Sequence, residues 1–223
     1  GFLFLCFLPS TVQSSIAFTS VAKGNVAGAV CSASFSNLMG MFITPILVSV
    51  FILGQTQHNF DPTQSIVQIT LLLLVPFILG QILRPWVFPY MQKRPKLVKT
   101  FDQGSILMVV YAAFSSAVVA GLWQQVGLGT LCLLIVLCSL LLTIVMLLAL
   151  WLPKWLGFNH ADQRTIFFCG SKKTLASGVP MAQILFIGQP LGMIVLPIMI
   201  FHQIQLMVCG MIANYWSKQA DTE

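Results

Sequence analysis

Two short polar runs stand out in an otherwise apolar chain, and their residue types are those that bind ions and small polar solutes. The first run, Ser10-Thr11-Val12-Gln13-Ser14-Ser15, follows Pro9 directly, and the second, Ser171-Lys172-Lys173-Thr174, follows Gly170. Hydroxyl and amide oxygens suit a hard cation such as sodium, whereas an ammonium group binds anions. The two runs are therefore the first candidates for a binding site.

The composition identifies the solvent that surrounds these runs. Of the 223 residues, 57% are apolar and only 7% are charged, against about 25% charged in an average soluble domain. Because charged side chains normally cover a soluble protein, most of this exterior must face a lipid bilayer. The net charge of +6 does not indicate nucleic-acid binding, since the basic residues lie between apolar runs and form no basic face.

Apolar segments long enough to cross a bilayer as helices, about 20 residues each, recur along the chain. We expect full spans at about residues 26–53, 65–84, 104–122, 128–152 and 190–216. Two further segments, residues 2–22 and 163–187, are each interrupted by one of the polar runs. The sequence therefore predicts an all-α polytopic membrane protein with about seven helical spans, two of them broken.

The order of these segments indicates an internal repeat. Each broken segment is followed by a short turn and one long apolar helix, and three spans lie between the two pairs. A repeat of five helices would invert its second copy in the membrane, as in many secondary transporters. We predict that the chain is part of a ten-helix protein with inverted repeats (5+5), and that it begins within a helix of the first repeat.

This scheme divides the chain into five parts. They are the end of the first repeat (residues 1–54), an outer loop (55–64), the panel and core helices that open the second repeat (65–152), the second broken helix with the last core helix (153–216), and a cytoplasmic tail (217–223).

The distribution of basic residues predicts the orientation in the membrane. Of the 11 Lys and Arg residues, all but Lys172 and Lys173 fall on one side when alternate connections are assigned to opposite sides. Short cytoplasmic loops collect Lys and Arg. We therefore expect this side, with the C-terminus, to face the cytoplasm, and the protein to lie in the plasma (inner) membrane.

Polar clusters at membrane depth usually face a cavity, an ion or one another, because unsatisfied polar groups are costly there. The first broken segment offers oxygens from Ser10, Thr11, Gln13, Ser14 and Ser15. The alternative is that these groups bond to their own helix or hold neighbouring helices together.

Lys172 and Lys173 are the strongest single signal, since an ammonium group at the bilayer centre costs about 2.5–3.5 kcal/mol. One of them could bind an anionic substrate, or occupy the place where another transporter holds a cation. Alternatively, both side chains extend to water near the membrane surface. Ser171 and Thr174 flank the two lysines and are further candidate ligands.

The long helices after the two breaks supply candidate walls for the site. Ser32 and Ser36 share a face at i, i+4 spacing on the first, and Gln203 lies on the second beside His202. His202 is either a candidate proton carrier or a satisfied structural residue. The small residues could instead serve close helix packing.

The sequence contains no pattern typical of an enzyme. His58 and Asp61 in the outer loop pair with no nucleophile, and a Walker A motif is absent. The six cysteines lack CxxC spacing, so we expect unpaired packing residues. We expect no cofactor other than a sodium ion.

Both polar runs resemble motifs of the bile acid:sodium symporter family. Residues 8–25, with Thr44-Pro45 on the next helix, resemble the family's fourth and fifth helices, and residues 169–180 are similar to its sodium/bile acid cotransporter 7-like branch. The resemblance covers the whole chain. It implies a core and a panel domain, with the broken helices crossing beside sodium sites and a substrate crevice.

In the bile acid branch, a Ser-Asn pair in the first broken helix and a Glu-containing motif in the second supply sodium ligands. Ser14 and Ser15 match the first position loosely, but here the Asn and the acid are both missing. The sequence as a whole indicates a secondary transporter, expected to be a sodium-coupled symporter of a small organic anion that works by alternating access. The alternative is a non-transporting scaffold or regulator of ion homeostasis that acts through its basic cytoplasmic loops.

Overall fold

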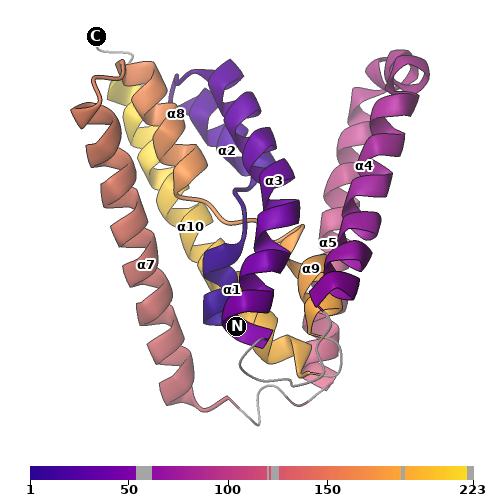
Figure 1. The fold of residues 1–223 in the computed structure, drawn as a ribbon. Helices are drawn as coiled ribbons and strands as arrows, with labels where there is room; N and C mark the ends of the chain where they lie inside the picture. Colours follow the sequence, from indigo (N-terminus) through magenta and orange to yellow (C-terminus); the bar gives the residue numbers. More distant parts are fainter. Residues whose placement is uncertain (54–61, 120, 122–125, 187–188, 220–223) are drawn as a thin grey trace.

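The computed structural model describes residues 1–53, 62–119, 121, 126–186 and 189–219, and within the helices of residues 62–119 it describes only part of the side chains (Figure 1). The regular elements in these ranges are all helices. His58 and Asp61, which the sequence analysis assigned to an outer loop, lie outside the described residues.

The first polar run interrupts a helix, as predicted. Helix α1 (Phe2–Phe7) ends at Leu8, whose backbone is extended (φ −73°, ψ 144°), and α2 (Val12–Val21) begins after the extended Thr11. Pro9 explains the break, because proline lacks an N–H group and forces the residue before it out of the helical region.

A tight turn connects α2 to the long helix α3 (Val26–Val48), which continues as the π-helical η1 (Ser49–Leu53). Lys23 in this turn has a left-handed backbone (φ 54°). Asn25 caps α3 by accepting a hydrogen bond from the Gly28 amide at 2.9 Å. The turn thereby reverses the chain without leaving the first amide groups of α3 uncapped.

The helices α4 (Pro62–Gln92) and α5 (Pro95–Val119) are longer than the predicted spans at 65–84 and 104–122. Helix α4 continues beyond the predicted span, and Pro76, Pro85 and Pro89 all lie inside it. A proline removes one backbone hydrogen bond, which a long helix in a membrane protein tolerates. The basic connection between the two helices is consequently a short turn.

The second polar run also interrupts a helix, as predicted. After α7 (Leu128–Trp155), helix α8 (His160–Gly170) ends, residues 171–177 are irregular, and α9 (Gly178–Leu185) begins. The long helix α10 (Leu191–Gln219) completes the fold. Each broken segment therefore precedes one long helix.

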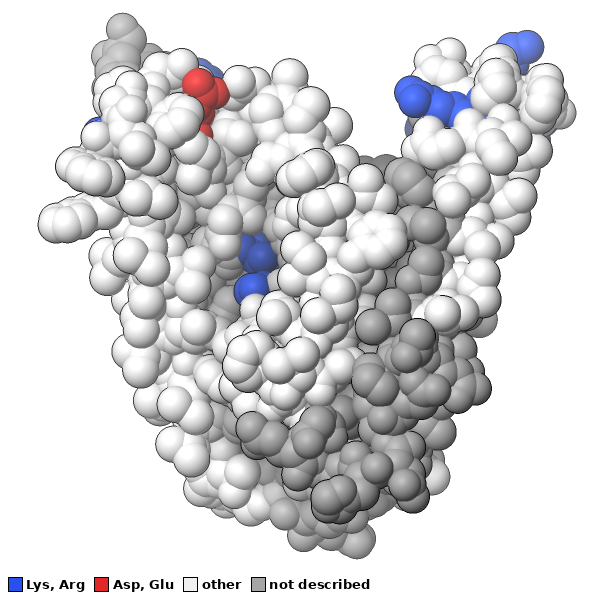
Figure 2. All heavy atoms as spheres, in the orientation of Figure 1, with Lys and Arg blue, Asp and Glu red and all other residues white. Residues whose placement is uncertain are grey.

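The two broken segments lie inside a bundle formed with α3, α7 and α10 (Figure 1). Helix α2 contacts α8, α3 and α10, so residues more than a hundred positions apart in the sequence pack together. The α4–α5 hairpin stands apart as an arm and contacts the bundle through α3, α9 and α10. Figure 2 shows a V-shaped opening between the arm and the bundle.

Among the residues that the structure describes, three helices are long and apolar enough to cross a membrane: Val26–Ile52, Leu128–Trp155 and Leu191–Gln219. They correspond to the predicted spans at 26–53, 128–152 and 190–216. The predicted span at 65–84 lies within α4, and the one at 104–122 overlaps α5, which ends at Val119. Seven spans and a ten-helix repeat therefore stay predictions.

The connections alternate between the two ends of the molecule. The turns after α2, α4 and α7 lie at the same end as the C-terminus (Figure 1). Lys and Arg side chains gather at this end (Figure 2). The sequence predicted this one-sided distribution of Lys and Arg, and we call the end that holds the C-terminus the basic end.

Candidate functional site

The two breaks meet, and hydroxyl groups of the first segment bond to backbone carbonyls of the second. Ser10 Oγ donates to the carbonyl of Cys169 at 2.6 Å, and Ser15 Oγ donates to that of Phe168 at 3.2 Å. Both carbonyls belong to the last turn of α8, where a helix has no internal donors left for them. Because lipid offers no water to replace these donors, the crossing itself satisfies the helix end.

The lysines of the second break bond in the opposite direction, to carbonyls of the first segment. The ammonium nitrogen of Lys173 donates to the carbonyls of Cys6 and Leu8, at 2.8 Å each. The ammonium nitrogen of Lys172 donates to the Ser14 carbonyl at 2.8 Å and lies 3.6 Å from the centre of the Phe18 ring.

Of the alternatives that the sequence left open, extension to water is excluded for Lys172, whose residue is only 1% exposed. Lys or Arg atoms also appear in a hollow about midway between the two ends of the molecule (Figure 2). The strongest signal in the sequence therefore lies in the crossing of the two broken segments.

Gln205 of α10 fixes the backbone of the second break. Its side-chain oxygen accepts from the Lys173 amide at 2.9 Å, and its side-chain nitrogen donates to the Lys173 carbonyl at 3.0 Å. The same nitrogen lies 2.9 Å from Nδ1 of His202, which makes His202 a satisfied residue. The predicted wall residue of this helix is Gln203, but Gln205 is the amide that bonds to the second break.

A cleft of about 580 Å³ opens beside the crossing. Its walls come from both broken segments and from α3, α5 and α10. The polar residues that line it are Thr11, Gln13, Ser14, Asn37, Gln103, Thr174, Ser177, His202 and Gln203. Asn37 also accepts a hydrogen bond from Ser177 Oγ at 3.4 Å, which connects α3 to the second break.

Two helix N-termini reach this cleft. Thr11 is the N-cap of α2 and Ser177 is the N-cap of α9, and neither side chain bonds to an amide of its own helix. The N-terminal end of a helix carries a partial positive charge. Both broken helices therefore present their positive ends to the cleft.

The predicted site residues separate into three groups. Those that line the cleft are Thr11, Gln13, Ser14, Thr174 and Gln203. Those within the crossing are Ser10, Ser15, Ser36, Ser171, Lys172 and Lys173. Ser36 Oγ accepts from the Ser10 amide at 3.2 Å, and Ser171 Oγ lies 4.0 Å from Cys209 Sγ. Ser32 belongs to neither group.

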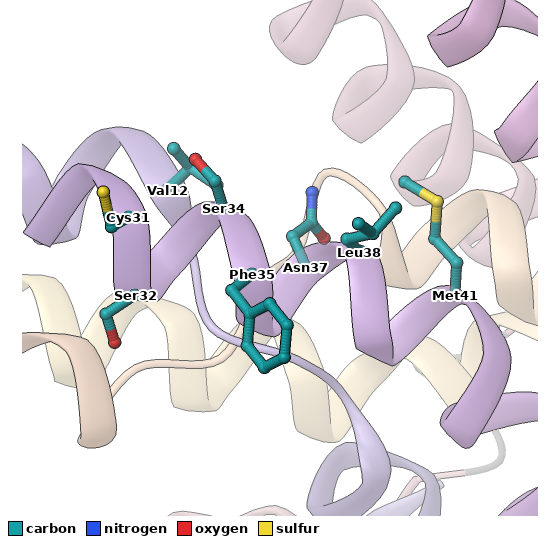
Figure 3. Close-up of a pocket in the computed structure, with 8 residues that line it drawn as sticks. All are labelled: Val12, Cys31, Ser32, Ser34, Phe35, Asn37, Leu38 and Met41. Atoms are coloured by element: carbon teal, nitrogen blue, oxygen red, sulfur yellow. The ribbon is translucent and has the colours of Figure 1, made fainter.

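Ser32 borders a separate hollow of about 750 Å³ along α3. Figure 3 shows Ser32 and Ser34 pointing to opposite sides of this helix, while Asn37 and Leu38 lie further along it. Asn37 lines both this hollow and the cleft. The predicted pair of Ser32 and Ser36 is thus divided between the α3 hollow and the first break.

The candidate sodium ligands differ from each other. Ser14 Oγ is buried without a hydrogen-bond partner in the part of the chain that the structure describes, whereas Ser15 Oγ is already bonded to Phe168. Within the described ranges, no group of three His, Cys, Asp or Glu residues could hold a metal ion. All six cysteines are free thiols. A sodium site at Ser14 and Ser15 stays a prediction.

Comparison with known proteins supports the resemblance seen in the sequence. Residues 1–218 match the SBF-like CPA transporter family. The protein PA2026 of Pseudomonas aeruginosa is 52% identical over 221 residues, which cover 99% of this chain and 66% of that protein. YfeH of Escherichia coli, named as a candidate symporter, is 51% identical over 222 residues with the same coverage of both chains.

A more distant relative carries a more specific name. Sodium/bile acid cotransporter 7 of Rattus norvegicus is 26% identical over 203 residues, which cover 90% of this chain and 59% of that protein. The chain spans just under two thirds of the bacterial relatives that it matches. It belongs to the SBF-like CPA transporter family of integral membrane transporters, which are not enzymes.

Proposed function

We propose that this chain is part of a secondary carrier that moves a small organic anion across the inner membrane by alternating access, with its C-terminus in the cytoplasm. The observation that carries the proposal is the 580 Å³ cleft, because both broken segments and α5 of the arm contribute to its walls. Its volume falls within the range of small-molecule sites, about 300–1,000 Å³.

The charges around the cleft favour an anion. The N-termini of α2 and α9 supply partial positive charge at its wall. Behind that wall, the ammonium groups of Lys172 and Lys173 bond to neutral carbonyls, and that of Lys172 also lies over the Phe18 ring, so these contacts leave both positive charges uncancelled. An anionic solute in the cleft would lower the energy of these charges.

Sodium is the proposed coupling ion, and Ser14 with Ser15 is its proposed place. The buried Ser14 hydroxyl has no hydrogen-bond partner among the described residues, and this supports the choice because such a group is costly unless something binds to it. The names of the vertebrate relatives also include sodium. Uptake driven by a sodium gradient is the property that this part of the proposal requires.

The contacts of the arm support a rocking motion. Helices α4 and α5 contact the bundle through α3, α9 and α10, and α5 contributes Gln103 and Leu107 to the cleft. Movement of the arm relative to the bundle would change one wall of the cleft and leave the crossing intact. This motion would expose the same site alternately to the two sides of the membrane.

The test is uptake by the full-length protein in proteoliposomes. Radiolabelled benzoate, succinate and taurocholate serve as probes, each with an inward sodium gradient and with a choline gradient instead. We expect saturable uptake of at least one probe, faster with sodium, and a loss of about tenfold or more in Thr174→Val. Thr143→Val on the exposed face of α7 is the matched control, with unchanged uptake.

A scaffold would take up none of the probes under either gradient. Saturable uptake that is equal in Thr174→Val and Thr143→Val would show that the cleft is not the transport site. Sodium-dependent uptake that survives the double substitution Ser14→Ala and Ser15→Ala would exclude the proposed sodium ligands.

A further inference from the structure

The Lys173 ammonium group occupies a position with an unusual set of partners. It bonds to the carbonyls of Cys6, in the last turn of α1, and Leu8, the residue at which α1 ends, at 2.8 Å each. Both carbonyls lie at the end of a helix, where the backbone has lost its own donors. The ammonium group is therefore the donor that the break at Pro9 requires.

Carbonyls released by a broken helix commonly coordinate the coupling cation in secondary transporters. They suit a cation because their oxygens are hard ligands and because the C-terminal end of a helix carries partial negative charge. In this chain, the same kind of position holds a positive charge attached to the opposite broken segment. A metal ion and the ammonium group would compete for the same two oxygens.

The backbone of Lys173 is held in place from two other directions. Gln205 bonds to both its amide and its carbonyl, and Thr11 Oγ1 donates to the carbonyl at 2.7 Å. With its peptide groups fixed by α10 and by the first break, the side chain has a short, defined path to Cys6 and Leu8. Lys172 differs, since it bonds to one carbonyl, that of Ser14 within α2.

We propose that Lys173 is a built-in cation: its ammonium group replaces a metal ion at the carbonyls of the first break, so this place binds no sodium and the crossing forms without it. The inference deepens the proposed function, because it leaves Ser14 and Ser15 as the place for a coupling ion. It does not depend on transport, since it concerns what holds the crossing together.

The test compares two substitutions of Lys173 in the purified full-length protein. Lys173→Ala removes the charge and leaves space beside the two carbonyls, whereas Lys173→Met removes the charge and fills most of the space. Thermal unfolding is followed in sodium chloride and in choline chloride at equal ionic strength. We expect Lys173→Ala to gain about 2–4 °C in Tm from sodium beyond any gain of the unchanged protein, and Lys173→Met to show no such extra gain.

An extra sodium response in Lys173→Met equal to that in Lys173→Ala, or none in either variant, would overturn the inference. Binding of radioactive sodium provides a second test that needs no change at Lys173. The double variant Ser14→Ala and Ser15→Ala should bind no sodium, because the other carbonyl site already holds the ammonium group. Sodium that stays bound in this double variant would overturn the inference.

Both readouts are independent of the uptake assay. If no probe is transported but Lys173→Ala gains its sodium response, the proposed function fails and the inference stands. If uptake depends on sodium but sodium shifts the Tm of Lys173→Ala no more than that of the unchanged protein, the inference fails and the proposed carrier function is unaffected.

Discussion

The two breaks solve the same problem with different chemistry. At the first, the hydroxyls of Ser10 and Ser15 donate to carbonyls at the end of α8, at 2.6 and 3.2 Å. At the second, the Lys173 ammonium group donates to two carbonyls at the end of α1, both at 2.8 Å. Each break therefore supplies the donors that the other lacks, one with neutral groups and one with a charge.

The difference has consequences for stability and for ligand binding. A neutral hydroxyl satisfies one carbonyl and adds no net charge, whereas one ammonium group satisfies two carbonyls and places a positive charge beside the cleft. Loss of the charged donor should accordingly destabilise the fold more than loss of a hydroxyl, because it leaves more carbonyls unbonded.

Lys173→Met should have the largest effect. Two buried carbonyls lose their donor at about 1–3 kcal/mol each, so we expect the free energy of unfolding to fall by about 2–6 kcal/mol. Chemical denaturation of the purified full-length protein measures this loss. Lys172→Met, which removes a second donor from one carbonyl inside α2, should destabilise less, and the reverse order would show that Lys173 is not the main support of the crossing.

Gly40→Ala should come next, since it tests how tightly the first break is packed. A β-carbon at Gly40 would lie 2.5 Å from the β-carbon of Pro9, and a proline ring cannot move aside. Overpacking of this kind costs about 1–3 kcal/mol, and the upper part of that range applies here. Gly80→Ala is the control, because a β-carbon there meets no atom of the described residues within 4 Å. Equal stabilities of the two variants would mean that α3 can withdraw from the break.

Gln205→Leu tests the support that α10 gives to the second break. The Lys173 amide loses its acceptor, while the Lys173 carbonyl keeps Thr11 as a donor. One unbonded buried group lowers the free energy of unfolding by about 1–3 kcal/mol. Gln203→Leu, on an exposed side of the same helix, should leave the denaturation midpoint unchanged.

Ser10→Ala should have a smaller effect than Lys173→Met. It removes the donor of one carbonyl, that of Cys169, and the expected loss is about 1–2 kcal/mol. Chemical denaturation of this variant is compared with that of Ser20→Ala, an exposed position of α2, and the difference isolates the effect of the Ser10 hydrogen bond. A loss as large as that of Lys173→Met would remove the distinction between neutral and charged donors.

The features that the sequence predicted correctly are those with a local cause. Pro9 marks the first break, the run around Lys172 marks the second, and the apolar length of α3, α7 and α10 marks three spans. The ends of α4 were not predictable from Pro85, because a long helix can continue past a proline whose missing bond it tolerates.

The contacts between breaks could not be predicted for a different reason. Which carbonyl Lys173 reaches, and that Gln205 rather than Gln203 bonds to its backbone, depend on the rotation of α10 relative to the broken segments. Two amides only two positions apart point to different sides of a helix, and the apolar pattern around them does not distinguish the sides. The types of the site residues were predictable, but their partners were not.

Ser14→Ala should have the smallest effect on stability and is the most specific test of ligand binding. The Ser14 hydroxyl has no hydrogen-bond partner among the described residues, so its removal breaks no bond and should change the free energy of unfolding by less than about 0.5 kcal/mol. A partnerless buried hydroxyl beside the cleft is instead available to a bound ion or solute. We therefore expect Ser14→Ala to weaken sodium-dependent uptake about tenfold while its Tm in choline chloride is unchanged. Thr19→Val replaces a buried hydroxyl that also lacks a hydrogen-bond partner among the described residues and lies away from the cleft, and it keeps the side-chain volume, so it should leave both uptake and stability nearly unchanged. If the two variants transport equally well, the free hydroxyl of Ser14 has no role in binding, and the first break serves only to bond the second.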